Sequence, residues 1–372
     1  MLGWLGLGLL STVVYTYAGY PVLVAVWARL RGRAPASQSD FEPTVSVCLS
    51  VHDGARHLDA KLKSLQGLDY PAHKLEILVF SDGSTDDSER IVRRFAETDP
   101  RIVLLSSTER LGKPSALNAL AAAAHGEVLL MNDVRQTLAP HALRALLAVL
   151  ADPQVGCVSG NLVLTGDTGS SAYWRYEKLI RGAEARLGAL VGVSGSIYAI
   201  RRRDFHELPR DVLLDDMFVP LVVAKRQKRI MLSEAAEAYD EAFPDEQEFG
   251  RKARTLAGNF QLIAKLPWLL LPHRNPVWFQ LWSHKLLRLA CPFALLGLLL
   301  TSNLLAWGEV AYPYERAGWQ ALALGQGVFY ALAALGGRAG RLGALARTFV
   351  VLNAAAVAGL WRFLRGTQSV AW

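Results

Sequence analysis

The chain has 372 residues, of which 52% are hydrophobic, and its mean hydropathy is positive. This length holds one soluble core of roughly 200 to 250 residues together with further apolar segments, which argues against a simple soluble domain. The net charge of +7 is better explained by a membrane boundary and an anionic substrate than by nucleic acid, because no module in the sequence combines aromatic and basic residues.

The N-terminal segment, residues 1–30, is predicted to be a transmembrane helix. Before Arg29 its only polar side chains are hydroxyls, and its length is sufficient to cross a bilayer core of ~30 Å. It lacks a basic n-region and a cleavage pattern, which favours a permanent anchor over a signal peptide. Arg29, Arg31 and Arg33 follow the apolar run, so the next part of the chain is expected in the cytoplasm.

Residues 43 to about 240 alternate between apolar runs and helical patterns. The runs TVSVCLSV, KLEILVFSDGS, RIVLLSS and GEVLLMND are typical of strands, and helices are predicted at residues 57–68, 87–98 and 114–124. Strands that are apolar throughout and alternate with helices predict a parallel sheet that is covered on both faces. Such sheets bind ligands at the carboxyl ends of their strands.

A short stretch that contains polar residues follows each of the four predicted strands. In chain order they are Val51-His52-Asp53, Asp82, Gly112-Lys113 and Asp133. Asp82 can accept a hydrogen bond from a base or a ribose, and Lys113 near a helix N-terminus can neutralise a diphosphate. Each signal alone is typical of an ordinary turn or helix cap, but their order at successive strand ends predicts a nucleotide site.

The C-terminal part adds three apolar stretches, at residues 289–307, 319–335 and 342–364. Residues 260–280 combine tryptophans, a lysine and prolines, which favours amphipathic helices at the membrane surface. Three crossings would leave Arg362 and Arg365 outside, so a re-entrant or interfacial stretch stays open as an alternative. The three cysteines are far apart in sequence and predict buried thiols in a reducing compartment.

Five motifs from residue 45 to 259 resemble the inverting glycosyltransferases of family 2. They are VSVCLSVHDGARHLDAKLKSL, EILVFSDGSTDDS, RLGKPSALNAL, LLDDMFVPL and RKARTLAGN. The resemblance is strongest to membrane-embedded synthases of cellulose, chitin oligosaccharides and hyaluronan. Ser81 stands where that family has an acid, His52-Asp53 where it has Tyr-Asn, and Thr255 where its Gln-x-x-Arg-Trp motif has tryptophan.

The resemblance implies an α/β GT-A fold, a Rossmann-like mixed sheet flanked by helices, and a UDP-sugar donor. It implies that Asp216, with Asp215 beside it, is the catalytic base that removes the proton of the acceptor hydroxyl. The positions it implies for the nucleotide sugar are Val51, His52, Asp53, Asp82, Lys113, Asp133, Arg135, Arg251 and Arg254. The acceptor would meet Gly195, Ser196 and Trp174.

Asp133 is the implied ligand of Mg²⁺ or Mn²⁺, but Arg135 replaces the second carboxylate of the family's Asp-x-Asp motif. A guanidinium binds phosphate oxygens with paired donors, so Arg135 would neutralise part of the diphosphate charge that the metal otherwise neutralises. We therefore expect a retained but weakened metal site. The alternative is that Arg135 turns away and pairs with a neighbouring acid.

The expected protein is a multi-pass enzyme of the inner or plasma membrane that extends a polysaccharide and translocates it through its own helices. The expected domains are 1–30 transmembrane, 31–258 cytosolic and catalytic, 259–284 interfacial, and 285–372 transmembrane. Transfer to a polyprenyl phosphate or another lipid is the first alternative, and a non-catalytic subunit that binds nucleotide sugar is the second. The partners would be the donor, a polysaccharide or lipid-linked acceptor and the bilayer, with no nucleic acid. The oligomeric state has no signal in the sequence.

Overall fold

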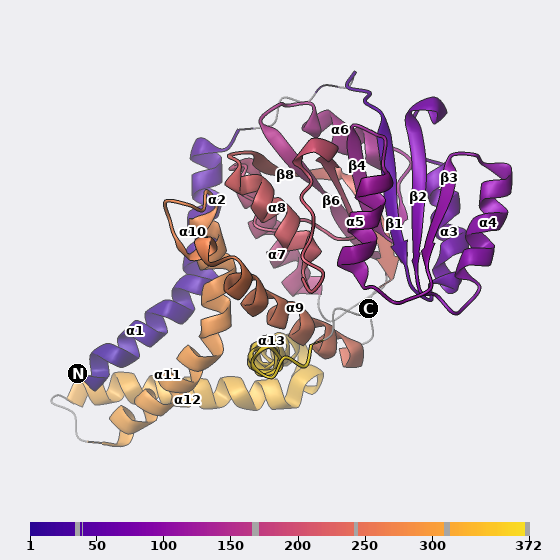
Figure 1. Ribbon diagram of the computed structural model, residues 1–372. Helices are drawn as coiled ribbons and strands as arrows, with labels where there is room; N and C mark the ends of the chain where they lie inside the picture. Colours follow the sequence, from indigo (N-terminus) through magenta and orange to yellow (C-terminus); the bar gives the residue numbers. More distant parts are fainter. Residues whose placement is uncertain (34–37, 39, 166–170, 242–244, 309–312, 369–372) are drawn as a thin grey trace.

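The computed structural model describes residues 1–33, 38, 40–165, 171–241, 245–308 and 313–368 (Figure 1). A sheet forms the core of the part drawn at the upper right of Figure 1. In the described chain its strands are β1 Val45–Val51, β2 Leu75–Asp82, β3 Ile102–Ser107, β4 Val128–Asp133, β5 Thr137–Leu138, β6 Val155–Thr165, β7 Ile197–Arg201 and β8 Arg229–Glu241. Their spatial order is β3-β2-β1-β4-β7-β6-β8-β5.

The first four strands form the parallel half that the sequence predicts. β1 lies between β2 and β4, parallel to both, and pairs Ser50 with Asp133. β7 is antiparallel to β4 and β6, so the sheet is mixed, which confirms the Rossmann-like mixed sheet that the family resemblance implies. The four apolar runs alone predicted only its parallel half. Since Ile197 at the start of β7 pairs with Asn132 at the end of β4, the loop before β7 lies beside Asp133.

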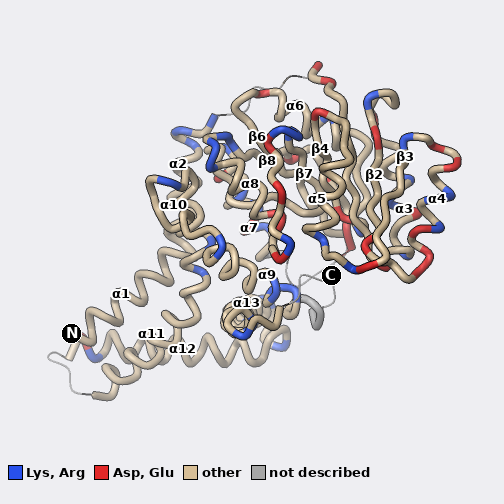
Figure 2. The backbone as a smooth tube through the Cα atoms, viewed as in Figure 1, with Lys and Arg blue, Asp and Glu red and all other residues tan. Residues whose placement is uncertain are grey.

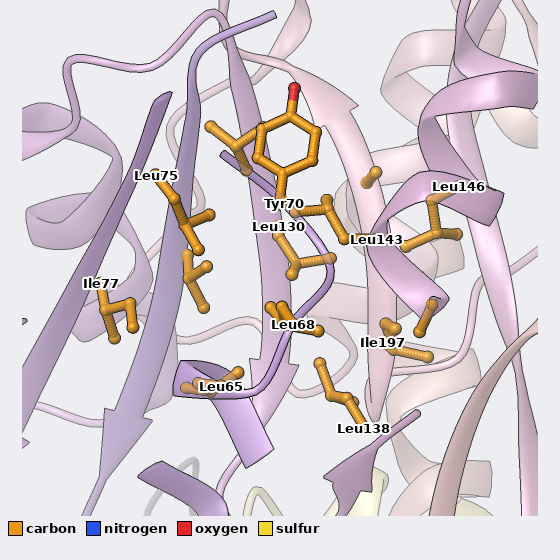
Figure 3. Close-up of a cluster of buried hydrophobic side chains, with 14 of the residues drawn as sticks. Leu65, Leu68, Tyr70, Leu75, Ile77, Leu130, Leu138, Leu143, Leu146 and Ile197 are labelled. Carbon is orange, nitrogen blue, oxygen red and sulfur yellow. The ribbon is translucent and has the colours of Figure 1, made fainter. Parts of the chain in front are cut away.

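Helices cover both faces of the sheet because neighbouring residues of each strand point to opposite faces. Val47 and Leu49 of β1 pack with Leu62 in one core, whereas Cys48 packs with Leu117 in the other. The first core contains residues of α3 Ala55–Gln66, α4 Ser88–Thr98 and α6 Ala142–Leu150, and Figure 3 shows part of it. The second contains residues of α5 Lys113–Ala123 and α8 Asp215–Lys225.

The remaining helices lie to the left of the sheet and below it in Figure 1, where α2 rises beside the sheet-containing part. They include α1 Leu2–Val14, α2 Tyr20–Arg31, α11 Leu287–Trp307, α12 Pro313–Leu335 and α13 Gly340–Leu364. Within the described residues three continuous helical segments are long and apolar enough to cross a membrane: Leu2–Arg31, Trp278–Trp307 and Pro313–Leu364. Figure 2 shows α1, α11 and α12 uncharged along most of their length, whereas charges crowd the sheet-containing part.

The sheet-containing part meets the apolar helices through α9 Asp245–Lys265 and α7 Ser171–Arg186. α13 lies against α9, where a Cβ atom on Gly359 would come within 2.9 Å of Ala257 N and 3.0 Å of Ala253 O. Only glycine allows two helix backbones to approach so closely. α9 continues through Asn259, so the expected border between residues 258 and 259 falls inside one helix.

Candidate active site

The candidate active site lies where the ends of β1, β2 and β4 approach the start of α8. Lys113 joins these elements, because its Nζ lies 2.9 Å from Asp133 Oδ1 and 3.2 Å from Asp215 Oδ2. Gly195 borders the same space. A Cβ atom there would lie 3.3 Å from Asp133 Oδ2, 3.8 Å from Lys113 Nζ and 3.9 Å from Asp216 Cβ. Residues far apart in the sequence therefore converge on one space, which the missing side chain of Gly195 keeps open.

Asp82 positions the loop that carries Lys113. Its Oδ1 accepts from Leu111 N at 2.7 Å and its Oδ2 from Gly112 N at 2.9 Å, and the residue is fully buried. Gly112 has φ of 87°, a left-handed conformation that favours glycine, and Lys113 begins α5 directly after it. Direct contact of Asp82 with a nucleoside remains a prediction, since both oxygens already hold the loop.

The turn after β1 is held against the turn after β2. Asp53 Oδ1 accepts from Thr85 N at 2.8 Å, and this backbone hydrogen bond lowers the pKa of Asp53. His52 donates from Nδ1 to the main-chain oxygen of Asp82 at 2.8 Å, and Val51 is buried at the end of β1. These side chains therefore fix two adjacent strand ends, while Asp53 stays largely exposed.

The carboxylates at the start of α8 differ in their surroundings from ordinary surface acids. Burial raises the pKa of Asp216 to about 7, and Asp215 adds to this effect, while Lys113 opposes it. Burial acts against the charge of Lys113, yet Asp133 and Asp215 raise the pKa of this lysine above its ordinary value. An acid with a pKa near neutrality, beside a permanent cation, is suited to accept a proton from a reacting group.

Arg135 is directed away from this centre. Its Nη2 donates to Asp240 Oδ1 at 2.6 Å and to the main-chain oxygen of Glu241 at 3.1 Å, both on β8. Gln136 donates to the other oxygen of Asp240 at 2.6 Å. A contact of Arg135 with a diphosphate therefore requires this ion pair to open, and it remains a prediction.

The acids at the centre are too few to bind a divalent metal by themselves, so oxygens of a bound donor would have to complete its coordination. In the ranges that the structure covers, no group of three or more His, Cys, Asp and Glu side chains is arranged to hold a metal ion. Asp133 Oδ1 is engaged by Lys113, while Asp133 Oδ2 faces the open space beside Gly195. One free carboxylate oxygen fits Mg²⁺ or Mn²⁺ if phosphate oxygens and water complete the coordination.

Three residues of α9 that the sequence analysis singled out, Arg251, Arg254 and Thr255, differ in their surroundings. Arg254 lies within electrostatic range of Asp215 and Asp216, and burial lowers its pKa. Arg251 is exposed one turn earlier, so its contact with a donor remains a prediction. Thr255 lines a cavity that opens beside Asp216.

This cavity, of about 320 Å³, extends from the centre to the apolar helices. Asp216, Gly195 and Trp174 all line it, so the structure brings two expected acceptor residues to the expected base. Ser196 lies behind the lining, with its Oγ 2.5 Å from Ser194 Oγ.

Sequence reasoning missed the opposite wall of the cavity. It consists of Tyr17, Glu177, Arg181, His284, Lys285, Arg288, Leu352, Asn353 and Ala356. One overlooked signal in the sequence was the charged run of His284, Lys285 and Arg288 directly before an apolar stretch. Ionisable residues in such positions are usually functional or paired.

Part of that wall is a buried network between α7 and the helix that leads into α11. His284 lies 3.2 Å from Glu177 Oε2 and 2.8 Å from Glu184 Oε1, and Arg288 also pairs with Glu177. Tyr20 donates to Glu184 at 2.6 Å. Burial opposes the charge of Glu177, but Arg288 and His284 hold the pKa of this carboxyl well below its usual range.

Comparisons with known proteins agree with this geometry. Residues 46–208 match the family described as Glycosyl transferase family 2. An N-acetylglucosaminyltransferase of Rhizobium sp. (strain N33) is 30% identical over 52% of this chain and 44% of its own length. An N-acetylglucosaminyltransferase of Rhizobium meliloti (strain 1021) is 31% identical over 43% of this chain and 39% of its own length. The chain thus spans less than half of these two curated relatives.

A solved structure resembles the chain over nearly its whole length. It is the mannosyltransferase PcManGT from Pyrobaculum calidifontis in complex with GDP-Man and Mn²⁺. The likeness has a TM-score of 0.76 and 26% identity, and it covers 98% of this chain and 99% of the other. The arrangement of the sheet and the apolar helices is therefore shared with that protein.

Proposed function

We propose that this chain is a family 2 glycosyltransferase that transfers a sugar from a nucleotide sugar to an acceptor hydroxyl in the cavity. The match of residues 46–208 to that family and the likeness to a solved mannosyltransferase support the proposal. The observation that carries the proposal is the convergence on Gly195. A carboxylate, a lysine and the expected base all lie within 4 Å of the position of its missing Cβ atom.

In this reaction the acceptor oxygen forms a bond to the anomeric carbon while Asp216 takes its proton. The bond from that carbon to the diphosphate breaks on the opposite side, and the nucleoside diphosphate leaves with the electron pair. Lys113 lies where it can stabilise the charge of the leaving group, and Arg254 is a second cation in range. One displacement of this kind inverts the configuration at the anomeric carbon.

A divalent metal would share Asp133 with the donor phosphates. When bound, Mg²⁺ or Mn²⁺ would neutralise charge on the diphosphate. The similar mannosyltransferase was solved with Mn²⁺, which supports a metal here too. Lys113 competes for the same carboxylate, so we propose a site that forms together with the donor rather than before it.

The donor is proposed to be a UDP-sugar, with GDP-mannose as the second candidate. The family resemblance supports the first, whereas the similar mannosyltransferase, which was solved with GDP-Man, supports the second. Donor choice depends on pocket shape rather than on any one residue that we describe.

The acceptor is proposed to reach the cavity from the membrane, because the lining includes residues of all three helices that are long enough to span it. Both a growing polysaccharide, translocated through these helices, and a lipid-linked acceptor agree with this route. Trp174 favours a sugar ring and the cations of the cavity favour an anionic lipid. We place the catalytic part on the cytoplasmic side of the inner or plasma membrane, since Arg29 and Arg31 end the N-terminal helix.

The test is a donor panel with the full chain in detergent. UDP-glucose, UDP-N-acetylglucosamine and GDP-mannose are incubated with membrane lipid extract and Mn²⁺, and the products are sized by mass spectrometry. We expect one donor to yield sugar-bearing product or free sugar. Nucleotide binding without turnover of any donor would instead support the alternative of a non-catalytic subunit.

A further inference from the structure

The cavity beside Asp216 carries more positive than negative charge. Its cations are Lys178, Arg181, Lys252, Lys285 and Arg288, and its acids are Glu177 and Asp216. Glu177 is already paired with Arg288 and His284. The acids of the lining therefore do not neutralise its cations.

Arg181 and Lys285 are cations that burial holds away from water, and Glu177 and Glu184 act on both of them only at longer range than an ion pair. Arg181 donates to Ser159 Oγ at 3.2 Å, and neither residue forms an ion pair within 4.0 Å with an acid in the described part of the chain. The two are close enough to repel each other electrostatically. Burial lowers the pKa of Arg181, which shows the cost of holding this charge away from water. Paired cations in such a place are stabilised by an anion between them.

The walls around these cations come from the apolar helices. Tyr17 belongs to the N-terminal segment, Lys285 to the segment Trp278–Trp307, and Asn353 to the segment Pro313–Leu364. A cavity of about 320 Å³ holds an anionic headgroup but not a long hydrocarbon chain. The chain of a lipid would therefore have to lie among or beside these helices.

We propose that Arg181 and Lys285 bind the phosphate of a membrane-lipid acceptor. The inference rests on the proposed function, because the phosphate would anchor a lipid-linked sugar whose hydroxyl faces Asp216. Undecaprenyl phosphate lacks that sugar and reports the contact with the phosphate alone. The donor diphosphate does not account for these cations, since inversion requires the leaving group to lie on the side of the anomeric carbon opposite to the base. A neutral polysaccharide would bring no anion into contact with either cation.

The experiment measures binding of undecaprenyl phosphate to the full chain in detergent by native mass spectrometry. Undecaprenol serves as the same chain without phosphate, and inorganic phosphate as the anion without a chain. In the wild type we expect undecaprenyl phosphate to bind well above undecaprenol, and inorganic phosphate to compete weakly. Lys285→Met should weaken the binding of undecaprenyl phosphate about tenfold or more, because one charge-assisted contact is lost. Lys285→Arg keeps the charge and should restore most of the affinity.

Lys265→Met is the matched control, because Lys265 pairs with Asp211 outside the cavity and loses the same charge. Unchanged nucleotide binding shows that each variant is folded. The proposal is overturned if Lys285→Met binds undecaprenyl phosphate as tightly as the wild type does. It is overturned as well if Lys265→Met weakens this binding as much as Lys285→Met does. It is also overturned if inorganic phosphate competes fully, because the ligand would then be a soluble anion. Failure of the proposed function would appear separately, as absence of nucleotide binding and donor turnover in the wild type.

Discussion

Substituting Asp216 by asparagine removes the proposed base while preserving its shape. Loss of a positioned base lowers kcat by about 10² to 10⁴-fold, so transfer by Asp216→Asn should fall in that range while nucleotide binding is retained. In the wild type, kcat/KM should depend on an ionisation near the raised pKa of Asp216, about 7. At pH 6 about one tenth of this acid is ionised and at pH 8 about nine tenths, so kcat/KM should fall about tenfold between pH 8 and pH 6.

The same substitution has a stability readout that does not depend on substrate. The folded-state pKa of Asp216 lies above its ordinary value of 3.8, so the folded protein favours the protonated acid. That stabilisation is complete below about pH 3.8 and is lost as the pH rises through about 7. Asparagine removes the ionisation, and Asp216→Asn should exceed the wild type in stability at pH 8 by at most an amount on the order of 4 kcal/mol, with no difference near pH 4.

Initial rates with varied donor, from pH 5.5 to 8.5, and thermal unfolding in detergent measure both effects. Glu207→Gln, an exposed position with the same change of charge, controls for general electrostatics. Full turnover by Asp216→Asn, or a rate that is flat across pH 6 to 8 in the wild type, would refute the assignment of the base.

Three further predictions concern the surrounding positions. Gly195→Ala should reduce donor turnover on the order of 10²-fold with little change in melting temperature. The new methyl group would stand 3.3 Å from Asp133 Oδ2, in the space where we propose that the substrate binds. Kinetics like those of the wild type would show that the substrate does not bind there. Asp82→Asn should cost about 1–3 kcal/mol of stability and raise the donor KM, because the amide group can accept a hydrogen bond from only one of the two N–H groups of the Lys113 loop. An unchanged KM would show that Asp82 does not influence donor binding. His284→Ala should cost about 3–5 kcal/mol in thermal unfolding, because two buried glutamates lose the group between them, and a neutral result would show the network to be dispensable.

The strand ends were predictable because they depend on local pattern. Each apolar run ends in a polar residue, and the observed β2 and β4 end at Asp82 and Asp133 as the sequence indicates. Parallel pairing then brings these ends together without any knowledge of side-chain packing. Lys113 was found for the same reason, as the first residue of a helix after such a strand.

The other half of the site depends on contacts between distant segments. Arg135 pairs with Asp240, 105 positions later, and nothing around Arg135 in the sequence indicates this partner. A mixed sheet was expected from the family resemblance, but the sequence did not indicate that β7 is an antiparallel strand, because its apolar run does not differ from those of parallel strands. The cavity wall remained hidden because three apolar segments build it only after they pack against α7 and α9.

The buried group formed by Tyr20, Glu177, Glu184, His284 and Arg288 couples the apolar helices to α7 of the sheet-containing part. A shortened chain that stops before Trp278, intended as a water-soluble enzyme, would keep both glutamates and lose the histidine and arginine that neutralise them. Such a fragment would expose or protonate these acids and lose one wall of the cavity beside Asp216. Crystallisation or screening campaigns with this protein therefore need the intact polypeptide in a lipid or detergent environment.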